Sequence, residues 1–281
     1  MRKLPLTKLR VFFLTLILVI VALGAWAFFI EPDRLVIHQQ VIKLTQLPSE
    51  FAGTRIAVIG DIHAGAPFIT PDKLQQIVLE INEQHPDLVV LLGDYMVRGK
   101  FYQHPIDPQV TADACKQLRA PLGVYAVLGN HDWWYDGLRV RNAFQNASIR
   151  VLDNEVAEVR RVQQSIFVIG LADAWTRPQR IAETVAKVPA GATAIAITHN
   201  PDVFPDIPET VELTLAAHTH GGQVNFPLLG RLVVPSSYGQ RYAAGLIHEN
   251  RKQLFVTTGI GTSILPVRFR VPPEIAILTL Q

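Results

Sequence analysis

The segment Arg55–His63 constrains the fold of this chain more than any other stretch. It contains an apolar run, Ile56–Ile59, with no polar face, as expected of a parallel strand that is buried in a sheet. Gly60 ends the run, and the carboxylate of Asp61 and the imidazole of His63 follow. Ordinary turns after strands also use Gly and Asp, so this segment alone predicts a strand and leaves two interpretations of its polar end, a turn or half of a metal site.

The same pattern recurs along the chain. Apolar segments are followed by polar side chains at four more places: 87–92 before Asp94, 123–128 before Asn130 and His131, 192–198 before His199, and 213–217 before His218 and His220. Helical signals lie between the first three strands, with a capped start at Thr70-Pro71-Asp72 and a second helix over 110–118. Parallel strands end at one edge of a sheet, so we predict an α/β fold in which these polar side chains converge.

The polar side chains at these five strand ends indicate a metal centre. The full set is Asp61, His63, Asp94, Asn130, His131, His199, His218 and His220. Oxygen and imidazole ligands without thiolate favour Mn, Fe or Zn over Ca, with Mg as a further alternative, and of these we expect Mn. The set is too large for one tetrahedral ion but suits two divalent ions that share a bridging carboxylate. Such pairs hydrolyse phosphoesters.

The N-terminal part of the chain predicts a membrane anchor. Residues 11–30 contain no charged side chain and are long enough to cross a bilayer as a helix. Basic residues precede this stretch, and Glu31 and Asp33 follow it, so the positive-inside rule places the rest of the chain outside the cytoplasm. A cleaved signal peptide is the alternative, although the stretch is longer than a signal core and has no clear cleavage box.

These features divide the chain into four parts: a basic segment 1–10, a transmembrane anchor 11–30, a connecting segment 31–50 and a globular domain 51–281. The formal net charge of +2 gives no reason to expect a nucleic-acid partner. The single cysteine, Cys115, cannot form an internal disulfide and is typical of a small core residue in a helix. The oligomeric state is not indicated by the sequence.

The order of the motifs resembles that of the calcineurin-like metallophosphoesterases. Every motif position is filled, by Gly60-Asp-Ile-His63, Gly93-Asp-(x)4-Gly99, Gly129-Asn-His-Asp132, His199 and His218-Thr-His220. The resemblance runs from about Arg55 to the C terminus and implies a four-layer α/β/β/α sandwich, preceded here by the one transmembrane helix.

This resemblance also implies a role for each site residue. One ion would be held by Asp61, His63 and His220, the other by Asn130, His199 and His218, with Asp94 bridging them. His131 would contact the phosphoryl group and assist the leaving oxygen, with Asp132 orienting it. Arg98 lies where many relatives carry an arginine, so it is a candidate for binding substrate phosphate, with a salt bridge to the scaffold as the alternative.

The anchor and three C-terminal motifs resemble the bacterial membrane-attached branch of this family. The motifs are Gly259-Ile-Gly-Thr262, Pro266-Val-Arg268 and Pro272-Pro-Glu274, of which the first also reads as a plain turn. Members of this branch are often described as phosphodiesterases and are related to UDP-2,3-diacylglucosamine hydrolases of lipid A synthesis. We therefore expect an enzyme of the bacterial inner membrane that hydrolyses a phosphodiester or pyrophosphate bond of a lipid or lipid-linked substrate.

Three alternatives remain at this point. A UDP-2,3-diacylglucosamine-type pyrophosphatase conflicts with the expected topology, because the related enzymes act in the cytoplasm. A catalytically silent metal-binding interaction module would have lost ligands, and none is missing here. A nuclease or protein phosphatase would use the same metals, but a nuclease should carry a basic groove, which the balanced charge does not indicate.

Overall fold

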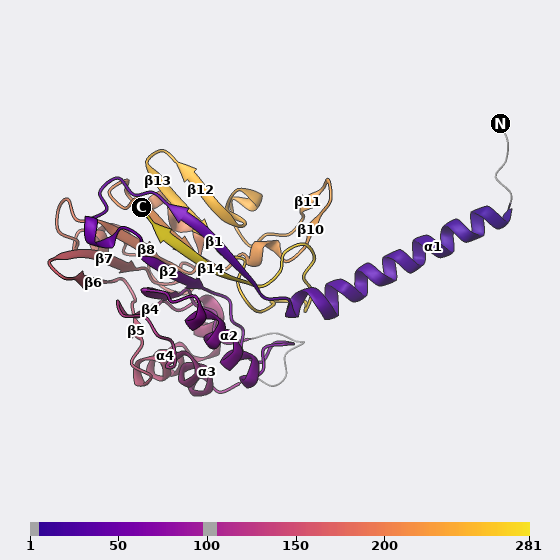
Figure 1. The fold of residues 1–281 in the computed structure, drawn as a ribbon, viewed down its shortest axis with the longest axis horizontal. Coiled ribbons are helices and arrows are strands. Elements are labelled where there is room, and N and C mark those ends of the chain that lie inside the picture. The colour runs from indigo at the N-terminus through magenta and orange to yellow at the C-terminus, as the bar shows by residue number, and fades with distance from the viewer. Residues whose placement is uncertain (1–5, 98–105) are drawn as a thin grey trace.

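The computed structural model describes residues 6–97 and 106–281 of the protein (Figure 1). Two six-stranded sheets form its centre. The first contains, in spatial order, β1 (Val36–Ile42), β14 (Glu274–Leu280), β2 (Arg55–Ile59), β3 (Leu88–Leu91), β4 (Val124–Ala126) and β5 (Arg150–Val151). The second contains β12 (Gly245–Glu249), β13 (Lys252–Val256), β9 (Leu213–Ala216), β8 (Ala194–Ile197), β7 (Gln164–Gly170) and β6 (Glu155–Arg161). A short hairpin, β10 (Asn225–Phe226) and β11 (Gly230–Arg231), stands apart.

The strands that carry the site motifs run parallel within each sheet. β2 pairs with β3, and β3 with β4, in parallel register, while β8 and β9 form a parallel pair in the second sheet. One apolar core joins the facing sides of the two sheets, with Ile56 and Val90 from the first and Ile195 and Leu215 from the second. The carboxyl ends of strands from both sheets therefore meet at one end of the sandwich.

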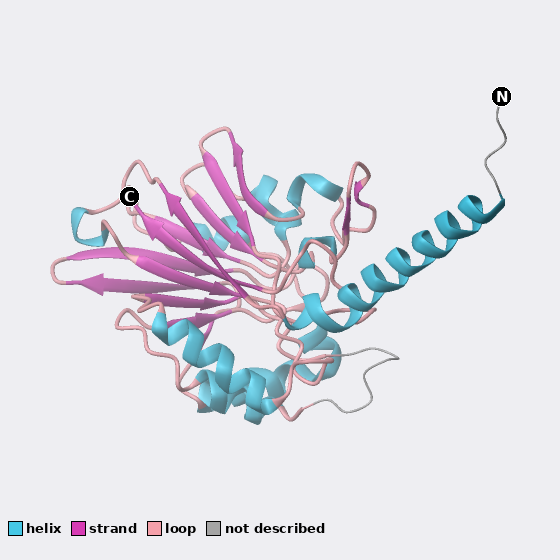
Figure 2. Ribbon diagram, turned by 45° about the vertical axis from the view of Figure 1, so that its right-hand side comes forward, coloured by secondary structure: helices cyan, strands magenta, loops and turns pink. Residues whose placement is uncertain are grey.

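Helices cover the outer faces of both sheets (Figures 1 and 2). The first sheet is covered by α2 (Pro71–Glu83), α3 (Pro108–Cys115) and α4 (Asn130–Asn146), and the second by α5 (Ile181–Val185) and the 3-10 turns at Pro201–Asp206 and Gly239–Tyr242. The predicted start of α2 is confirmed, because the Thr70 hydroxyl accepts a hydrogen bond from the Lys73 backbone N–H. The expected four-layer α/β/β/α arrangement is confirmed.

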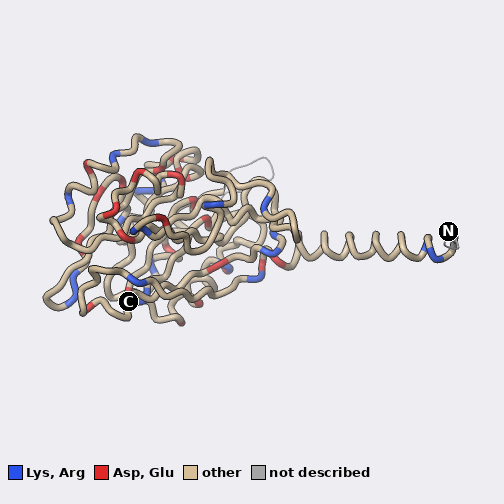
Figure 3. Tube along the Cα trace, turned by 90° about the horizontal axis from the view of Figure 1, so that it is seen from above, with Lys and Arg blue, Asp and Glu red and all other residues tan. Residues whose placement is uncertain are grey.

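The chain enters the domain through α1 (Leu6–Ala25), which continues as a π-helix, Trp26–Ile30, and a 3-10 turn, Glu31–Asp33. Within the described residues, one helix is long and apolar enough to cross a membrane, and its side chains are almost all exposed. Figure 3 shows it without charge except near its N-terminal end. The expected connecting segment 31–50 contains β1, which extends the first sheet beside β14.

Candidate metal centre

The candidate ligands lie in the loops that follow β2, β3, β8 and β9 and at the first residue of α4, after β4. Five of them adopt a left-handed backbone: Asp61 (φ 51°), His63 (φ 48°), Asp94 (φ 54°), His218 (φ 72°) and His220 (φ 51°). Asp and His tolerate this region better than most residues, yet each such position costs about 1–3 kcal/mol. Backbone strain is therefore concentrated where the ligands converge.

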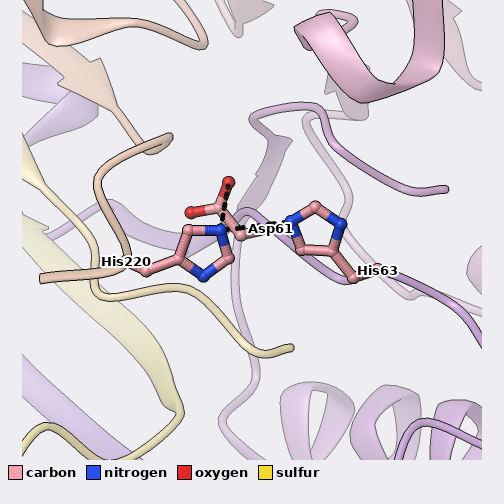
Figure 4. Close-up of side chains that lie close together, drawn as sticks. All are labelled: Asp61, His63 and His220. Atoms are coloured by element: carbon pink, nitrogen blue, oxygen red, sulfur yellow. Dashed lines mark hydrogen bonds and ion pairs between the residues drawn. The ribbon is translucent and has the colours of Figure 1, made fainter. Parts of the chain in front are cut away.

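The first cluster joins the loop after β2 to the loop after β9. The Nε2 atoms of His63 and His220 lie 3.1 Å apart, and His220 Nε2 lies 3.8 Å from Asp61 Oδ1. Figure 4 shows the two rings directed toward one another with the carboxylate beside them. One ligand atom from each of these three residues lies within 4.8 Å of the other two, so the group could hold a cation.

The second cluster brings the two sheets together at Asp94. Asp94 Oδ2 lies 3.3 Å from His199 Nε2 and 3.7 Å from His63 Nε2, so this carboxylate stands between the two groups. His199 Nε2 is also 3.1 Å from Asn130 Oδ1 and 3.1 Å from His218 Nδ1. Asp94, His199 and His218 form a second group that could hold a cation.

Two hydrogen bonds orient the rings of His63 and His199. His63 Nδ1 lies 3.2 Å from the Met96 carbonyl and His199 Nδ1 lies 2.7 Å from the Leu92 carbonyl. A carbonyl only accepts, so both Nδ1 atoms carry the hydrogen in these bonds. The Nε2 atoms then face the cluster, which is the arrangement that orients metal-ligating imidazoles.

Burial and charge set the protonation of the cluster. Burial lowers the pKa of His63 and of His218 to about 3, so both rings are neutral near pH 7. Burial alone would lower the pKa of His199 as well, but the nearby carboxylates, Asp94 foremost, raise it to about 10. The imidazoles around it, led by His199, hold the pKa of Asp94 well below its usual range despite burial.

Several buried polar atoms in the cluster fit a cation. Asp61 Oδ2 is buried and has no hydrogen-bond partner among the described residues. The close approach of His63 Nε2 and His220 Nε2 places two ring nitrogens where a cation would use the lone pairs of both. The donor set of imidazole and oxygen without thiolate fits Mn, Fe, Zn or Mg.

His131 and Asp132 lie beside the cluster, at the start of α4. The His131 backbone N–H donates to Asp94 Oδ1 at 2.8 Å, and its ring packs edge-on to His63 with centroids 4.8 Å apart. Asp132 is buried, and its carboxylate accepts hydrogen bonds from the backbone N–H groups of Asp94, Tyr95, Met96 and Gly129. These four bonds tie the loop after β3 to the start of α4, so Asp132 positions the backbone of both Asp94 and His131.

The glycines of the Gly259-Ile-Gly-Thr262 motif pack against the first cluster. Gly259 has φ +68°, and a Cβ there would lie 2.6 Å from Asp61 Cβ, while one on Gly261 would lie 2.5 Å from the Ile62 carbonyl oxygen. The two glycines therefore let the backbone of this motif approach the ligand loop closely, which a plain turn would not require.

Sequence reasoning assigned no role to three residues near the cluster. Asp173 is buried after β7 and accepts bonds from the backbone N–H groups of Trp175 and Thr176, and the Trp175 ring lies edge-on to His218 with centroids 4.4 Å apart. Asp173 follows the same sequence pattern as Asp61 and Asp94, an acidic residue shortly after a buried strand, and this pattern could have identified it. Arg268 is fully buried and donates to the carbonyls of Thr258, Gly259 and Gly261, which no local pattern indicates.

The structure brings together all seven expected metal ligands and His131 and Asp132. The tenth candidate, Arg98, lies outside the described residues.

Comparison with known proteins gives the following matches. A sequence profile described as calcineurin-like phosphoesterase matches residues 54–222. An uncharacterized metallophosphoesterase of Bacillus subtilis, YkuE, is 30% identical over 261 residues, covering 91% of this chain and 89% of the relative. The phosphodiesterase YaeI of Escherichia coli is 27% identical over 247 residues, covering 85% of this chain and 86% of the relative. The UDP-2,3-diacylglucosamine pyrophosphatase LpxG of Chlamydia trachomatis is 25% identical over 314 residues, covering 90% of this chain and 91% of the relative.

Proposed function

Because the chain belongs to the calcineurin-like phosphoesterase family, whose members are metal-dependent hydrolases of phosphoester bonds, we propose that it is a membrane-attached enzyme with two divalent ions. Its proposed substrate is a phosphodiester or pyrophosphate with a lipid or lipid-linked alcohol. The observation that carries the proposal is the position of Asp94, whose Oδ2 lies within 3.7 Å of imidazoles from both clusters.

We assign Asp61, His63 and His220 to one ion, and Asn130, His199 and His218 to the other, with Asp94 between them. Manganese is the proposed metal in both positions. When bound, two such ions polarise a phosphoryl group and supply hydroxide from water for in-line attack. The backbone bonds of Asp132 and the carbonyl bonds of His63 and His199 hold these ligands in place before substrate arrives.

His131 is the proposed proton donor to the leaving oxygen. Its backbone bond to Asp94 holds it beside the bridging carboxylate, and its ring is only partly buried, so a substrate could reach it. A general acid positioned in this way contributes about 10²–10⁴ to the rate. Asp132 acts as a positioning residue through the backbone that it binds.

Membrane attachment through α1 rests on its apolar length and on its continuity with the domain. The indole N–H of Trp26 donates to Glu31 at 2.7 Å, and Glu31 in turn accepts from the Val271 backbone N–H at 2.8 Å. Cleavage before Trp26 would remove the helix but leave these contacts, whereas an uncleaved helix holds the domain at a fixed distance from the bilayer. The basic residues Lys8 and Arg10 support a cytoplasmic N terminus and an extracytoplasmic domain at the bacterial inner membrane.

A second candidate function is pyrophosphate hydrolysis of a nucleotide-linked lipid, which the match to LpxG favours. It requires the domain on the cytoplasmic side. Protease treatment of intact spheroplasts separates the two candidates: digestion of the domain supports the extracytoplasmic topology, and protection of the domain supports the nucleotide-linked substrate.

The proposed chemistry is tested by hydrolysis of bis-p-nitrophenyl phosphate by the full chain with added Mn. We expect Asp94→Asn to lower kcat/KM by at least a thousandfold, about 4 kcal/mol, because it removes the shared carboxylate charge. Asp113→Asn, which changes an exposed carboxylate on α3, is the matched control and should retain full activity. Equal activity of the two variants would reject the site assignment.

A further inference from the structure

Exposed apolar side chains gather around the point where α1 leaves the domain. They belong to two segments, the β10–β11 hairpin with the residues after it and the loop before Arg268. We call them the apolar rim, which consists of Phe226, Leu228, Leu229, Leu232, Val233, Ile264 and Leu265. Leu228 is fully exposed and Ile264 is 72% exposed, whereas most other exposed aliphatic residues of the domain, such as Leu79 and Leu138, stand singly. A soluble surface rarely exposes so many apolar groups together.

Hydrogen bonds connect the two segments to each other. The Asn225 backbone N–H donates to the Phe269 carbonyl at 2.9 Å, and the Phe269 N–H donates to the Gln223 carbonyl at 2.9 Å. The Gln223 side chain also donates to the Leu265 carbonyl and accepts from the Ser263 N–H. The hairpin and the loop therefore form one connected surface.

The same surface is joined to the base of the apolar helix. The Arg268 backbone N–H donates to the Ala27 carbonyl at 3.0 Å, and Glu31 accepts from the Val271 N–H. Figures 1 and 2 both place the β10–β11 hairpin on the side of the domain from which α1 leaves. If α1 spans the bilayer, the rim lies where the bilayer surface would be.

The charges near the rim suit a lipid surface. No Asp or Glu occurs between residues 213 and 248 or between 250 and 273, while Arg231 and Arg270 lie in these two stretches. Arg270 is exposed and Arg231 partly so. Apolar side chains that lie in stretches of the chain with arginine and without acidic residues match the boundary between acyl chains and head groups.

From these observations we propose that the apolar rim inserts into the outer leaflet of the membrane that α1 crosses and so attaches the domain at a second point. This inference rests on the membrane attachment proposed above. His220 lies only a few residues before the hairpin, and Gly261, next to the Ile264 loop, contacts the His63 loop. Insertion of the rim would place the metal ligands close to the membrane surface, within reach of a head group that has not left the bilayer.

Quenching of single-site probes tests the proposal. The native Cys115 is buried, so an environment-sensitive fluorophore attached to the folded full chain reports an introduced cysteine. We would label Leu228→Cys, Ile264→Cys, Leu18→Cys in α1 and Val162→Cys, and reconstitute each in vesicles of phosphatidylcholine and phosphatidylglycerol with spin-labelled lipid. Val162 is the matched control, because it is 82% exposed in the β6–β7 turn, at the end of the domain opposite α1 in Figure 1.

The proposal predicts strong quenching at Leu18→Cys, clear quenching at Leu228→Cys and Ile264→Cys, and none at Val162→Cys. A charged substitution in the rim, Leu229→Asp, should reduce the quenching of the Ile264→Cys probe. Quenching at Leu18→Cys with none at either rim position overturns the rim proposal and leaves the anchor standing. Absence of quenching at Leu18→Cys rejects the anchor, and the rim is then judged by its own two probes against Val162→Cys.

Discussion

The interior of the sandwich and the loops at its carboxyl end are built on opposite principles. Between the sheets, strands such as β2 and β3 bury apolar side chains on regular backbone, and their packing provides the stability of the domain. A few residues further on, Asp61 and Asp94 are buried carboxyl groups in left-handed backbone. The comparison teaches that the strands supply the free energy that keeps the strained ligand loops in place, so changes in the two regions should have separable effects.

Replacing His131 should have a large effect on rate and little effect on stability. We expect His131→Ala to lower kcat for bis-p-nitrophenyl phosphate by about 10²–10⁴, because the proton donor is lost. The melting temperature should stay near that of the wild type, since the ring is partly exposed. His248→Ala, at an exposed position on β12, is the control and should change neither quantity. A full-rate His131→Ala enzyme would remove this residue from the chemistry.

A core substitution should show the reverse. Phe51 is fully buried between the sheets, and Phe51→Ala should lower the free energy of unfolding by about 3–5 kcal/mol, measured by urea denaturation. The protein that remains folded should keep its activity within about twofold of the wild type, because Phe51 precedes β2 whereas the ligand loop follows it. Loss of activity without loss of stability would show that the two regions are not separable.

Two glycines sharpen the comparison at the level of single atoms. Gly259 (φ +68°) and Gly53 (φ +81°) share a left-handed backbone, but a Cβ would strike Asp61 only at Gly259, and at Gly53 it meets nothing within 4 Å. Alanine at either site should cost about 1–2 kcal/mol of stability through backbone strain. Only Gly259→Ala should weaken Mn binding, by tenfold or more in calorimetric titration. Equal Mn affinities would mean that Gly259 does not position Asp61.

The last prediction concerns stability at alkaline pH and lies in the apolar layer under α3. Burial raises the pKa of the Cys115 thiol to about 12, above its ordinary value of 9. As the pH rises, the thiol therefore ionises in the unfolded chain before it ionises in the folded protein. The neutral thiol contributes its full stability below pH 9. Between pH 9 and 12 the free energy of unfolding falls by about 1.4 kcal/mol per pH unit. Unfolding curves of wild type and Cys115→Ala should converge across this window. A constant difference between them would contradict the buried neutral thiol.

The sequence predicts those parts of the fold that depend on local signals. β2 and the Thr70 cap of α2 follow from apolar runs and capping chemistry within a few residues, and both are confirmed. The convergence of the strand ends follows from their repetition along the chain. Two parts were not predictable in this way. The left-handed conformation at His218 and the buried position of Arg268 depend on partners distant in sequence, such as the Asp61 carboxylate that accepts the His218 N–H, and no local pattern encodes them.

The role of β1 shows the same limit. The sequence separates residues 31–50 only as a connecting segment, and the parallel pairing of β1 with β14, more than two hundred residues later, is set by the completed sheet. The place of Trp175 beside His218 likewise depends on the Asp173 turn after β7. Pairings of this length are decided by packing, which single-sequence reasoning does not evaluate.

We expect two ions to share the Asp94 carboxylate, and the stoichiometry of metal binding tests this most directly. The purified full chain, stripped of metal and dialysed against Mn, should contain two ions per chain by elemental analysis, and Asp94→Asn should reduce this number. A wild-type protein that binds one ion or none, or an Asp94→Asn variant that keeps both ions with unchanged affinity, would contradict the account.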